Sequence, residues 1–431
     1  MRLVVSMPET TVEGFVEEIR DLGGLKFIKV YATNGYKQIT INKKKTDPKL
    51  VAEFDRLTRQ SCIRVVGEEK PLPGPDEEGT EVHPSRLEIL SIAAVPLPLE
   101  PSGKVPAELD TRFAWRFLDL RDDAKRTIFQ VETSVEHYMR EYFREHGFIE
   151  LHSPKLIGAP SESGAEVFSL PYFGREAYLA QSPQFYKQMA ICAGFNRVFE
   201  IAPVFRAESS FTYRHSTEFT SVDIEIGYLN SFEDLIAFEQ DWLVYVLKKV
   251  KAEWGKKIME TFGTEVEVPK VPFPQVTMTE AYDIVEAAGI KVDRNSDLSS
   301  EGEKELGKYV KDKMGSDFVF LTEFPESVRP FYHMKPEGNG KVTLSADLLY
   351  KGLEITTIAQ REHRYEILRK QAVGKGLHLH NIEFYLDFFK YGAPPHGGFG
   401  FGLARFMLGL LGQKTVKEVT LLPRDPKTLF P

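Results

Sequence analysis

Several arginines stand where this chain leaves an apolar stretch, a position from which side chains can reach a ligand. Arg206 follows a strand-like run, Arg214 and His215 lie in the loop beyond it, and Arg405 begins an apolar helix after alternating glycines. An arginine stays charged and can bind two phosphate oxygens at once, and a phenylalanine such as Phe219 offers a flat face to a purine. No P-loop sequence is present, so a nucleotide site would have to use these arginines. Surface salt bridges and a core phenylalanine explain the spacing alone equally well.

The composition is that of a folded protein with more than one domain. The chain has 431 residues, of which 42% are hydrophobic and 27% charged, which suits two or three domains. No apolar run approaches the roughly 18 residues of a membrane span, and acidic residues near the start oppose an export signal. Two cysteines without metal-ligand spacing exclude a disulfide framework and fit a reducing cytoplasm. At a net charge of −8, any nucleic acid would have to bind local basic patches.

Residues 1–95 contain short strand patterns separated by turn signals, which predicts a small β-barrel. The Asn34-Gly35 pair is a strong hairpin signal. Four prolines in the stretch 96–109 predict a stiff linker, and residues 96–124 are interpreted as a hinge between domains. Barrel strands are expected at 12–19, 25–31, 36–41, 62–66 and 85–92, with a short helix at 50–58.

From residue 125 the pattern mixes helices and strands without the regular alternation of a doubly wound sheet. Apolar residues at helical spacing predict an amphipathic helix over 126–146 that ends at Gly147. We expect an α+β domain over 125–431, built on a largely antiparallel sheet. Further helices are predicted at 183–192, 232–254, 278–288, 300–313, 363–375, 382–390 and 404–411. Strands are predicted at 177–180, 197–202, 221–229, 318–322, 344–350 and 353–357.

Three short motifs occur in order in this second part: GFIELHSP at 147–154, FRAE at 205–208 with its loop to Phe219, and GFGLAR at 400–405. Together they resemble motifs 1, 2 and 3 of the class II aminoacyl-tRNA synthetases. Three further stretches are similar to the aspartyl members of the archaeal and eukaryotic type: QSPQFYKQ at 181–188, QREH at 360–363 and YGAPPHGG at 391–398. The resemblance spans nearly the whole chain. It implies an N-terminal OB-fold that binds the anticodon and a class II catalytic domain.

The resemblance implies ATP-dependent attachment of L-aspartate to tRNA(Asp), or to both tRNA(Asp) and tRNA(Asn), through an aspartyl adenylate. The implied catalytic residues are Arg206 at the α-phosphate, Arg405 and Glu354. The implied ATP-binding set is Arg206, Glu208, Arg214, His215, Phe219, Glu354 and Arg405, with Arg405 and Phe219 on either side of the adenine. Mg²⁺ would be bound by Asp347, Glu354 and Thr357, in line with its preference for carboxylates beside phosphates. An ion pair within the sheet is the ordinary alternative for the two carboxylates.

The same resemblance implies a pocket for the amino acid. Because aspartate and asparagine have nearly the same shape, Lys187 and Arg361 would have to distinguish them by charge. Asparagine would leave these two cations unpaired in a closed pocket, at a cost of roughly 2–5 kcal/mol. The ordinary alternatives are a solvated helix lysine at 187 and a helix surface residue at 184. The implied aspartate-binding set is Glu162, Ser182, Gln184, Lys187, Asp223, Thr357 and Arg361.

In the barrel, the resemblance implies that Phe27 stacks on an anticodon base and that Gln38 reads it, with the lysines at 43–45 near phosphates. Phe27 could otherwise be a core residue, and the lysine run a solvated face. Glu17 stands where the family often has tryptophan or histidine. An acid at this position would repel RNA phosphates and weaken anticodon discrimination.

Other departures and alternatives follow from the same comparison. Ile358 replaces a small residue and would narrow or shift the aminoacyl pocket, while Ala404 replaces a glutamate that the family tolerates losing. A homodimer through 147–154 is implied, and neither a membrane nor a DNA partner is expected. Two other functions stay open: aspartyl-adenylate formation for small-molecule amidation such as asparagine synthesis, and non-catalytic RNA binding. The anticodon barrel opposes the first, and the retained site residues oppose the second.

Overall fold

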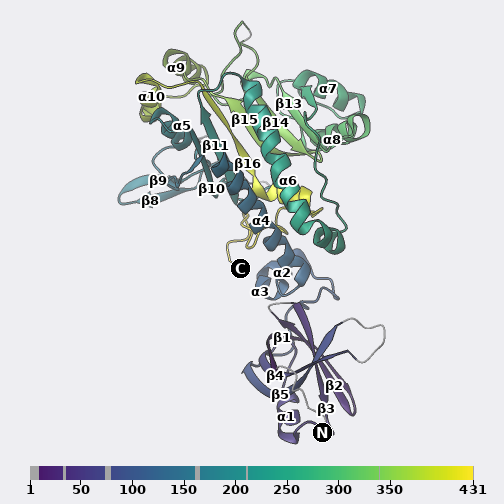
Figure 1. The fold of residues 1–431 in the computed structure, drawn as a ribbon. Helices are drawn as coiled ribbons and strands as arrows, with labels where there is room; N and C mark the ends of the chain where they lie inside the picture. The colour runs from purple at the N-terminus through teal and green to yellow at the C-terminus, as the bar shows by residue number, and fades with distance from the viewer. Residues whose placement is uncertain are drawn as a thin grey trace. The chain divides into compact units, whose positions relative to one another are not determined.

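The computed structural model describes residues 9–32, 35–72, 79–160, 166–209, 212–338 and 340–430. The chain forms two compact units, Met1–Asp123 and Ala124–Pro431, and each is described by itself (Figure 1). Within the described residues, no helix is both long enough and apolar enough to cross a membrane.

The first unit contains a closed barrel, as the strand patterns predict. In strand β2 every second residue is buried, including Ile28 and Val30, so one face of the strand fills the barrel while the other stays accessible. The helix α1 begins where the side chain of Asp47 accepts a hydrogen bond from the backbone N of Lys49, and it inserts Phe54 into the core. The strands run in the order β1 (Glu9–Leu22), β2 (Leu25–Ala32), β3 (Gly35–Asn42), β5 (Thr80–Ser91) and β4 (Cys62–Pro71), with α1 at Pro48–Phe54.

Two short helices follow the barrel, in a segment where the sequence indicated only a linker. They are α2 (Leu109–Ala114) and α3 (Arg116–Asp119). Arg112 and Arg116 both donate to the buried carboxylate of Asp119, at 2.9 and 2.5 Å. This ion cluster, together with the burial of Phe113 and Leu118, accounts for an ordered segment after the prolines.

The second unit is built on a sheet of eight described strands. All neighbouring strands are antiparallel except the pairs β12–β13 and β10–β6, so the predicted α+β class is confirmed. The strand order is β12 (Gln275–Thr277), β13 (Phe318–Thr322), β14 (Ser345–Tyr350), β15 (Leu353–Gln360), β16 (His396–Gly402), β11 (Glu218–Gly227), β10 (Arg197–Phe205) and β6 (Ile149–Glu150). A smaller sheet pairs β9 (Arg175–Leu179) with β7 (Leu156–Ile157) and β8 (Ser169–Tyr172).

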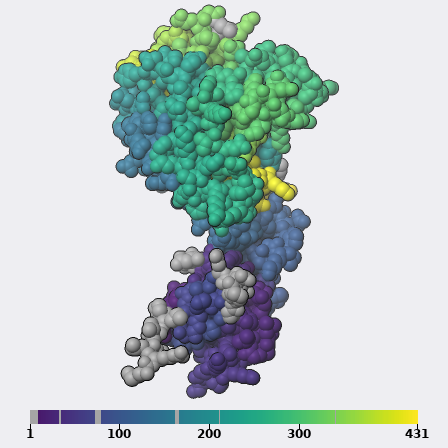
Figure 2. All heavy atoms as spheres, turned by 45° about the vertical axis from the view of Figure 1, so that its right-hand side comes forward, coloured from purple at the N-terminus to yellow at the C-terminus, as the bar shows by residue number. Residues whose placement is uncertain are grey.

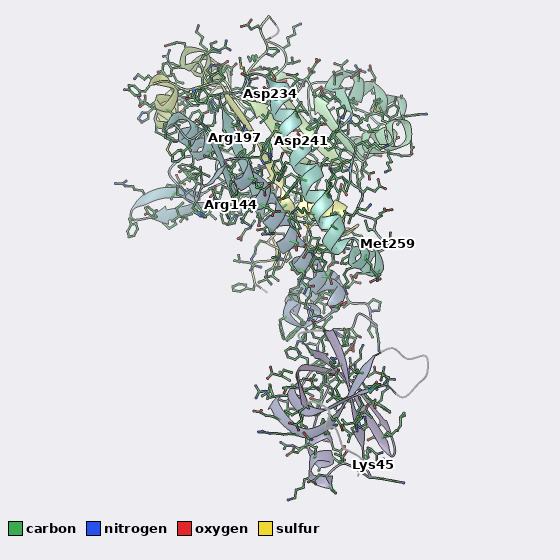
Figure 3. The ribbon with its side chains drawn as sticks, viewed as in Figure 1. Lys45, Arg144, Arg197, Asp234, Asp241 and Met259 are labelled. Carbon is green, nitrogen blue, oxygen red and sulfur yellow. The ribbon has the colours of Figure 1, made fainter. Side chains whose placement is uncertain are left out.

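Two long helices, α4 (Asp123–Glu145) and α6 (Phe232–Phe262), pack on one face of the large sheet (Figure 1). Trp242 is the centre of this layer, with ring centroids 5.1–5.2 Å from those of Phe143, Phe399 and Phe401. The sequence predicted an earlier end for α6, but the helix continues until Gly263 takes a left-handed conformation. Figure 3 shows Asp234, Asp241 and Met259 along the outward side of α6.

The remaining helices surround the sheet. α7 (Met278–Ala287) and α8 (Ser300–Met314) pack near β12, β13 and β14, whereas α5 (Gln184–Cys192), α9 (Tyr365–Gly374) and α10 (Glu383–Lys390) form a separate cluster. α11 (Leu403–Leu410) follows β16, and short 3-10 turns lie at Glu326–Val328 and Leu379–Ile382. In the space-filling view, teal and green segments that are distant in sequence lie side by side on this unit (Figure 2).

Candidate functional site

A cavity of about 380 Å³ lies on the face of the large sheet opposite α4 and α6. The alternation of strand residues creates the two faces: in β11, Val222 and Ile224 belong to the helix-covered core, whereas Ser221 and Asp223 line the cavity. Cross-strand register places Asp223, Gly400, Thr357 and Asp347 in one row across four strands. The sheet therefore brings together residues that are far apart in sequence.

Most of the residues that the sequence predicted for the site line this one cavity. They are Ser182, Gln184, Lys187, Arg206, Glu208, Arg214, His215, Phe219, Asp223, Glu354, Thr357, Arg361 and Arg405. Asp347 is not among the lining residues, and Glu162 lies outside the described residues. Lys187 is 3% exposed and Gln184 4% exposed, which excludes the alternative that either is a surface residue.

One part of the cavity is lined by arginines with unused hydrogen-bond donors. The Nε atoms of Arg206 and Arg214 are buried without a hydrogen-bond partner in the described part of the chain. Arg206 lies over the ring of Phe219 at 5.6 Å, and Phe219 is only partly buried, so it is not a core residue. Arg405 donates to a carboxylate oxygen of Glu354 at 3.1 Å. Buried donors that lack acceptors are suited to an anion with several oxygens.

His215 is a neutral member of this arginine group. Burial, followed by repulsion from Arg405 and Arg214, lowers the pKa of His215 to about 4. Its Nδ1 is 2.6 Å from the hydroxyl of Thr212. At neutral pH the ring can therefore hydrogen-bond to a ligand without adding charge.

The candidate metal residues occupy neighbouring positions on β14 and β15. Asp347 lies directly across the strands from Thr357, whose hydroxyl donates to Glu354 at 3.3 Å. Burial and repulsion from Glu354 raise the pKa of Asp347 to about 7, although Arg329 donates to its Oδ2 at 2.6 Å. Burial opposes charge on Glu354, but Arg405 and other arginines hold its pKa below the ordinary value.

These residues fit a hard cation that shares its coordination with a substrate. No group of three or more His, Cys, Asp or Glu side chains in the described ranges is arranged to hold a metal ion. Mg²⁺ needs fewer, since it is usually bound by one or two carboxylates together with substrate phosphates and water. The buried Oδ1 of Asp347 has no hydrogen-bond partner among the described residues, although Asp347 lies behind the residues that line the cavity.

The other part of the cavity is a buried cluster with two cations and two anions. Lys187 donates to Asp223 at 2.9 Å and lies 3.5 Å from Glu225. Arg361 contacts Glu225 through both Nε at 3.0 Å and Nη2 at 3.4 Å. Asp223 and Glu225 therefore lie against Lys187 and Arg361, and the expected selection of aspartate over asparagine by these two cations stays a prediction.

Sequence reasoning missed several residues of the site. Glu225 has 0% exposure and follows Asp223 by two positions, so the period of a strand could have placed it on the same face. Arg329 and His333 line the cavity from a segment between β13 and β14 that has no recognisable motif. Glu303, at the start of α8, binds Arg214 at 2.5 Å. Because Arg214 and Glu303 lie far apart in the chain, no local sequence pattern predicts the contact between them.

Ile358 does not narrow the cavity, contrary to expectation. Its side chain is fully buried in the core beneath α4 and α6, while its neighbour Thr357 faces the cavity. Successive side chains of β15 point to opposite faces of the sheet, so Ile358 and Thr357 face different sides. Ala404 does line the cavity.

The accessible face of the barrel carries the residues predicted for RNA. Phe27 is half-buried and lies opposite Thr40, which excludes a core role, and the amide of Gln38 donates to Glu81 at 3.1 Å. Glu17 pairs with Lys29 at 2.7 Å, and its expected effect on anticodon discrimination stays a prediction.

The predicted lysine run divides into one paired and two exposed side chains. Lys43 binds Asp21 at 2.7 Å, whereas Lys44 and Lys45 are exposed. Figure 3 shows Lys45 at one end of the barrel, beyond the end of β3.

The fold and the cavity agree with the comparison to known families. Residues 108–426 match the model of the tRNA synthetases class II (D, K and N). This chain belongs to that family. It is 43% identical over 422 residues to the aspartate–tRNA(Asp/Asn) ligase of Aeropyrum pernix, an alignment that covers 97% of this chain and 94% of that one. The aspartate–tRNA(Asp) ligase of Pyrococcus horikoshii is 42% identical over 420 residues, which cover 97% and 95%.

Solved structures agree with this assignment. The asparaginyl-tRNA synthetase from Pyrococcus horikoshii, complexed with asparaginyl-adenylate, superimposes with a TM-score of 0.91 at 28% identity over 99% of this chain and 97% of that one. The aspartyl tRNA synthetase from Entamoeba histolytica gives 0.88 at 29% identity, with 99% and 90% covered.

Proposed function

We propose that this chain is an aspartate–tRNA ligase, which forms aspartyl adenylate from L-aspartate and ATP and transfers the aspartyl group to tRNA(Asp). The observation that carries the proposal is the single cavity with two different parts. One part has arginines with unused donors and suits a polyphosphate. The other part holds the buried Lys187–Arg361 cluster and suits a small acidic amino acid. The names of the relatives in Aeropyrum and Pyrococcus support this choice.

The proposed chemistry has two steps. An oxygen of the aspartate α-carboxylate attacks the α-phosphorus of ATP, the bond to the β-phosphate breaks, and pyrophosphate leaves. A 3′-terminal hydroxyl of the tRNA then attacks the acyl carbon, and AMP leaves. Both steps depend on alignment of the reacting atoms and on stabilisation of charge, so a general base is not required.

The proposed roles come from the family resemblance, and the positions of the side chains in the cavity support them. Arg206 would neutralise the charge that grows on the α-phosphate, and its contact with Phe219 would hold that ring beside the adenine. Arg405, oriented by Glu354, would cover the opposite face of the base, while Arg214 and His215 would contact the tail phosphates. Asp347, Glu354 and Thr357 would hold Mg²⁺, which when bound supplies positive charge at the phosphate oxygens.

The two units are proposed to have different functions, anticodon binding in the first and catalysis in the second. Residues 1–95 would bind the anticodon through the face that carries Phe27 and Gln38, residues 96–124 would connect, and residues 125–431 would catalyse. A cytoplasmic homodimer is proposed through 147–154, where Ile149 is 49% exposed on the edge strand β6.

Two measurements with the purified full-length protein test the proposal. The first is aspartate-dependent exchange of pyrophosphate into ATP, and the second is aspartate charging of tRNA(Asp) and tRNA(Asn) side by side. Charging of both tRNAs would extend the function to the Asp/Asn range named for the Aeropyrum relative, and charging of tRNA(Asp) alone would restrict it. Exchange without any charging would favour a small-molecule acceptor, while the absence of exchange would favour a non-catalytic RNA-binding protein.

A further inference from the structure

Glu303 is a buried carboxylate that neither the motifs nor the proposed roles use. It lies beside the arginine-lined part of the cavity, which is formed by Arg206, Arg214 and Arg405, but it does not line the cavity itself. The side chain is 6% exposed, and its backbone belongs to the first turn of α8, where its N–H donates to the carbonyl of Ser299 at 2.9 Å. The helix therefore holds this carboxylate at a fixed place outside the cavity.

One oxygen of Glu303 contacts two residues that do line the cavity. Oε2 accepts a hydrogen bond from Nη1 of Arg214 at 2.5 Å and another from the backbone N–H of Glu354 at 3.3 Å. Arg214 lies in the loop between β10 and β11, whereas Glu354 belongs to β15. A single carboxylate thus joins the segment proposed to contact the tail phosphates to the strand proposed to hold Mg²⁺.

The loop that carries Arg214 also has anchors that do not involve α8. The carbonyl of Tyr213 accepts from the N–H of Val416 at 2.8 Å, and the carbonyl of Arg214 accepts from Nε of Arg405 at 3.4 Å. These contacts hold the backbone of the loop, whereas Glu303 holds the guanidinium group. Loss of the Glu303 carboxylate should therefore release mainly the side chain of Arg214 and leave the loop in place.

The contact with Glu303 has two opposite effects on what Arg214 offers a ligand. An arginine side chain has many rotamers, so a free guanidinium loses entropy when a ligand fixes it. With Nη1 bound to Glu303, that loss occurs before a ligand arrives, and the other guanidinium nitrogens are left for phosphate oxygens. Nε is buried without a partner among the described residues. The negative charge of Glu303, however, reduces the attraction of Arg214 for a phosphate.

We propose that Glu303 is a positioning residue for ATP, because it holds the guanidinium of Arg214 in the orientation that binds the tail phosphates. The inference rests on the proposed function and adds to it a residue of α8. Orientation outweighs the unfavourable charge, since Arg206 and Arg405 line the same part of the cavity and also supply positive charge. The loss of Glu303 should therefore weaken the binding of ATP and spare ligands that lack the tail phosphates.

Substitutions in the full chain separate position from charge. Glu303→Met removes the acceptor but keeps a side chain of similar length, whereas Glu303→Gln keeps an oxygen that can accept from Arg214. Arg214→Met, alone and combined with Glu303→Met, completes a double-mutant cycle. Glu301→Met is the matched control, because Glu301 lies in the same turn of α8 and is exposed.

Calorimetric titration with ATP and with AMP gives the two dissociation constants, and aspartate-dependent pyrophosphate exchange gives KM for aspartate. AMP is the informative comparison because it lacks the tail phosphates. We expect Glu303→Met to raise Kd for ATP by about 10- to 100-fold, as expected for the loss of a charge-assisted hydrogen bond. Kd for AMP and KM for aspartate should change by less than about threefold.

The other variants test whether Glu303 acts through Arg214. Glu303→Gln should lie between the wild type and Glu303→Met, and Glu301→Met should match the wild type. The double variant should bind ATP no more weakly than Arg214→Met alone, because the residue that Glu303 positions is already absent. If Glu303→Met does not fold, Glu303→Gln and the double variant still provide the comparison, since neither leaves a buried arginine without a partner.

Three results would overturn the inference. Tighter binding of ATP by Glu303→Met would show that charge outweighs orientation. Equal losses for ATP and AMP, or additive losses in the double variant, would show a general structural role. All three leave the proposed function intact if the wild type shows aspartate-dependent exchange. A wild type without that exchange would overturn the proposed function and this inference with it.

Discussion

Glu225 supplies half of the negative charge in the buried amino-acid part of the cavity. We expect Glu225→Gln to lower the free energy of unfolding by about 3–5 kcal/mol, because removal of one partner leaves a buried cation without its full counter-charge. Urea unfolding measures the change. Added L-aspartate should recover more stability in the variant than in the wild type, since its carboxylate brings back a negative charge.

The matched control is Glu68→Gln. Glu68 pairs with Lys70 at 2.9 Å, but the two side chains are 44% and 41% exposed. Pairs of this kind contribute little, so the change should stay within about 0.5 kcal/mol. Similar losses in the two variants would show that Glu225 does not balance a buried cation.

Glu239, which does not line the cavity, predicts a dependence of stability on pH. It is 0% exposed on α6, and burial raises the pKa of its carboxyl group to about 8, although the nearby hydroxyl of Thr356 acts against this shift. In the unfolded chain a glutamate titrates near pH 4.3, so between the two values the folded protein binds more protons and rising pH removes stability. Relative to Glu239→Gln, the wild type should lose on the order of 4 kcal/mol between pH 4.5 and 8.

Urea unfolding of both proteins at several pH values tests this prediction. Parallel stability curves for the wild type and Glu239→Gln would contradict it. A steeper fall for the variant would contradict it as well, because glutamine has no proton to lose.

At the scale of elements, helix α8 and the turn between β14 and β15 pack glycine against glycine. A Cβ on Gly307 would overlap the backbone of Gly352, which has a φ of +73° and belongs to the turn between Asp347 and Glu354. We expect Gly307→Ala to displace this turn, to lower Tm, and to raise KM for ATP in pyrophosphate exchange more than KM for aspartate.

Gly255→Ala is the control for the intrinsic effect of alanine in a helix. Gly255 lies inside α6, where the nearest atom to a new Cβ is the side-chain Cγ of Lys251 at 3.5 Å. This variant should gain about 0.5–1 kcal/mol of stability. If Gly307→Ala gains as much stability as Gly255→Ala, the close approach of helix α8 and the turn does not prevent a side chain at residue 307.

Elements with strong periodicity were predictable, and those defined by close packing were not. The 3.6-residue spacing of Ile128, Val131 and Val135 predicts α4, since burial follows that spacing. β16 has the sequence HGGFGFG, which reads as a loop, yet it lies between β11 and β15. Its glycines permit that position, because a Cβ on Gly398 would overlap the carbonyl of Ile224.

The same difference separates the predictable part of the site from the rest. Arg206, Lys187 and Arg361 belong to short recognisable motifs, so the amino-acid sequence alone is enough to identify them. His333 lines the cavity, and Glu303 binds the cavity residue Arg214, only because the fold brings distant segments together. His333 and Glu303 contact residues that lie 28 and 89 positions away in the sequence, and no local sequence pattern predicts such contacts.

At the scale of the whole molecule, the two units should be separable in function. A protein of residues 124–431 retains the cavity and the core beneath α4 and α6, so it should keep aspartate-dependent pyrophosphate exchange. It lacks the face with Phe27 and Gln38, so tRNA charging should fall by at least about tenfold, mainly through KM for tRNA. Substituting Phe27→Ala in the full chain should give a smaller loss in the same direction.

Steady-state charging at several tRNA concentrations provides this measurement. Equal KM values for tRNA in the full chain and in residues 124–431 would show that the barrel does not contribute to RNA binding. Loss of pyrophosphate exchange in a folded 124–431 protein would show that the cavity needs the first unit.

The aromatic packing around Trp242 also has an optical consequence. The chain has three tryptophans: Trp115 is 40% exposed, Trp254 is half-buried, and Trp242 is fully buried against Phe399 and Phe401 of β16. The next residues of that strand, Gly400 and Gly402, line the cavity. The indole of Trp242 should therefore emit at short wavelength, resist acrylamide quenching, and change its fluorescence when a ligand shifts β16. The protein thus carries an intrinsic fluorescent reporter directly behind the strand that forms the floor of its cavity.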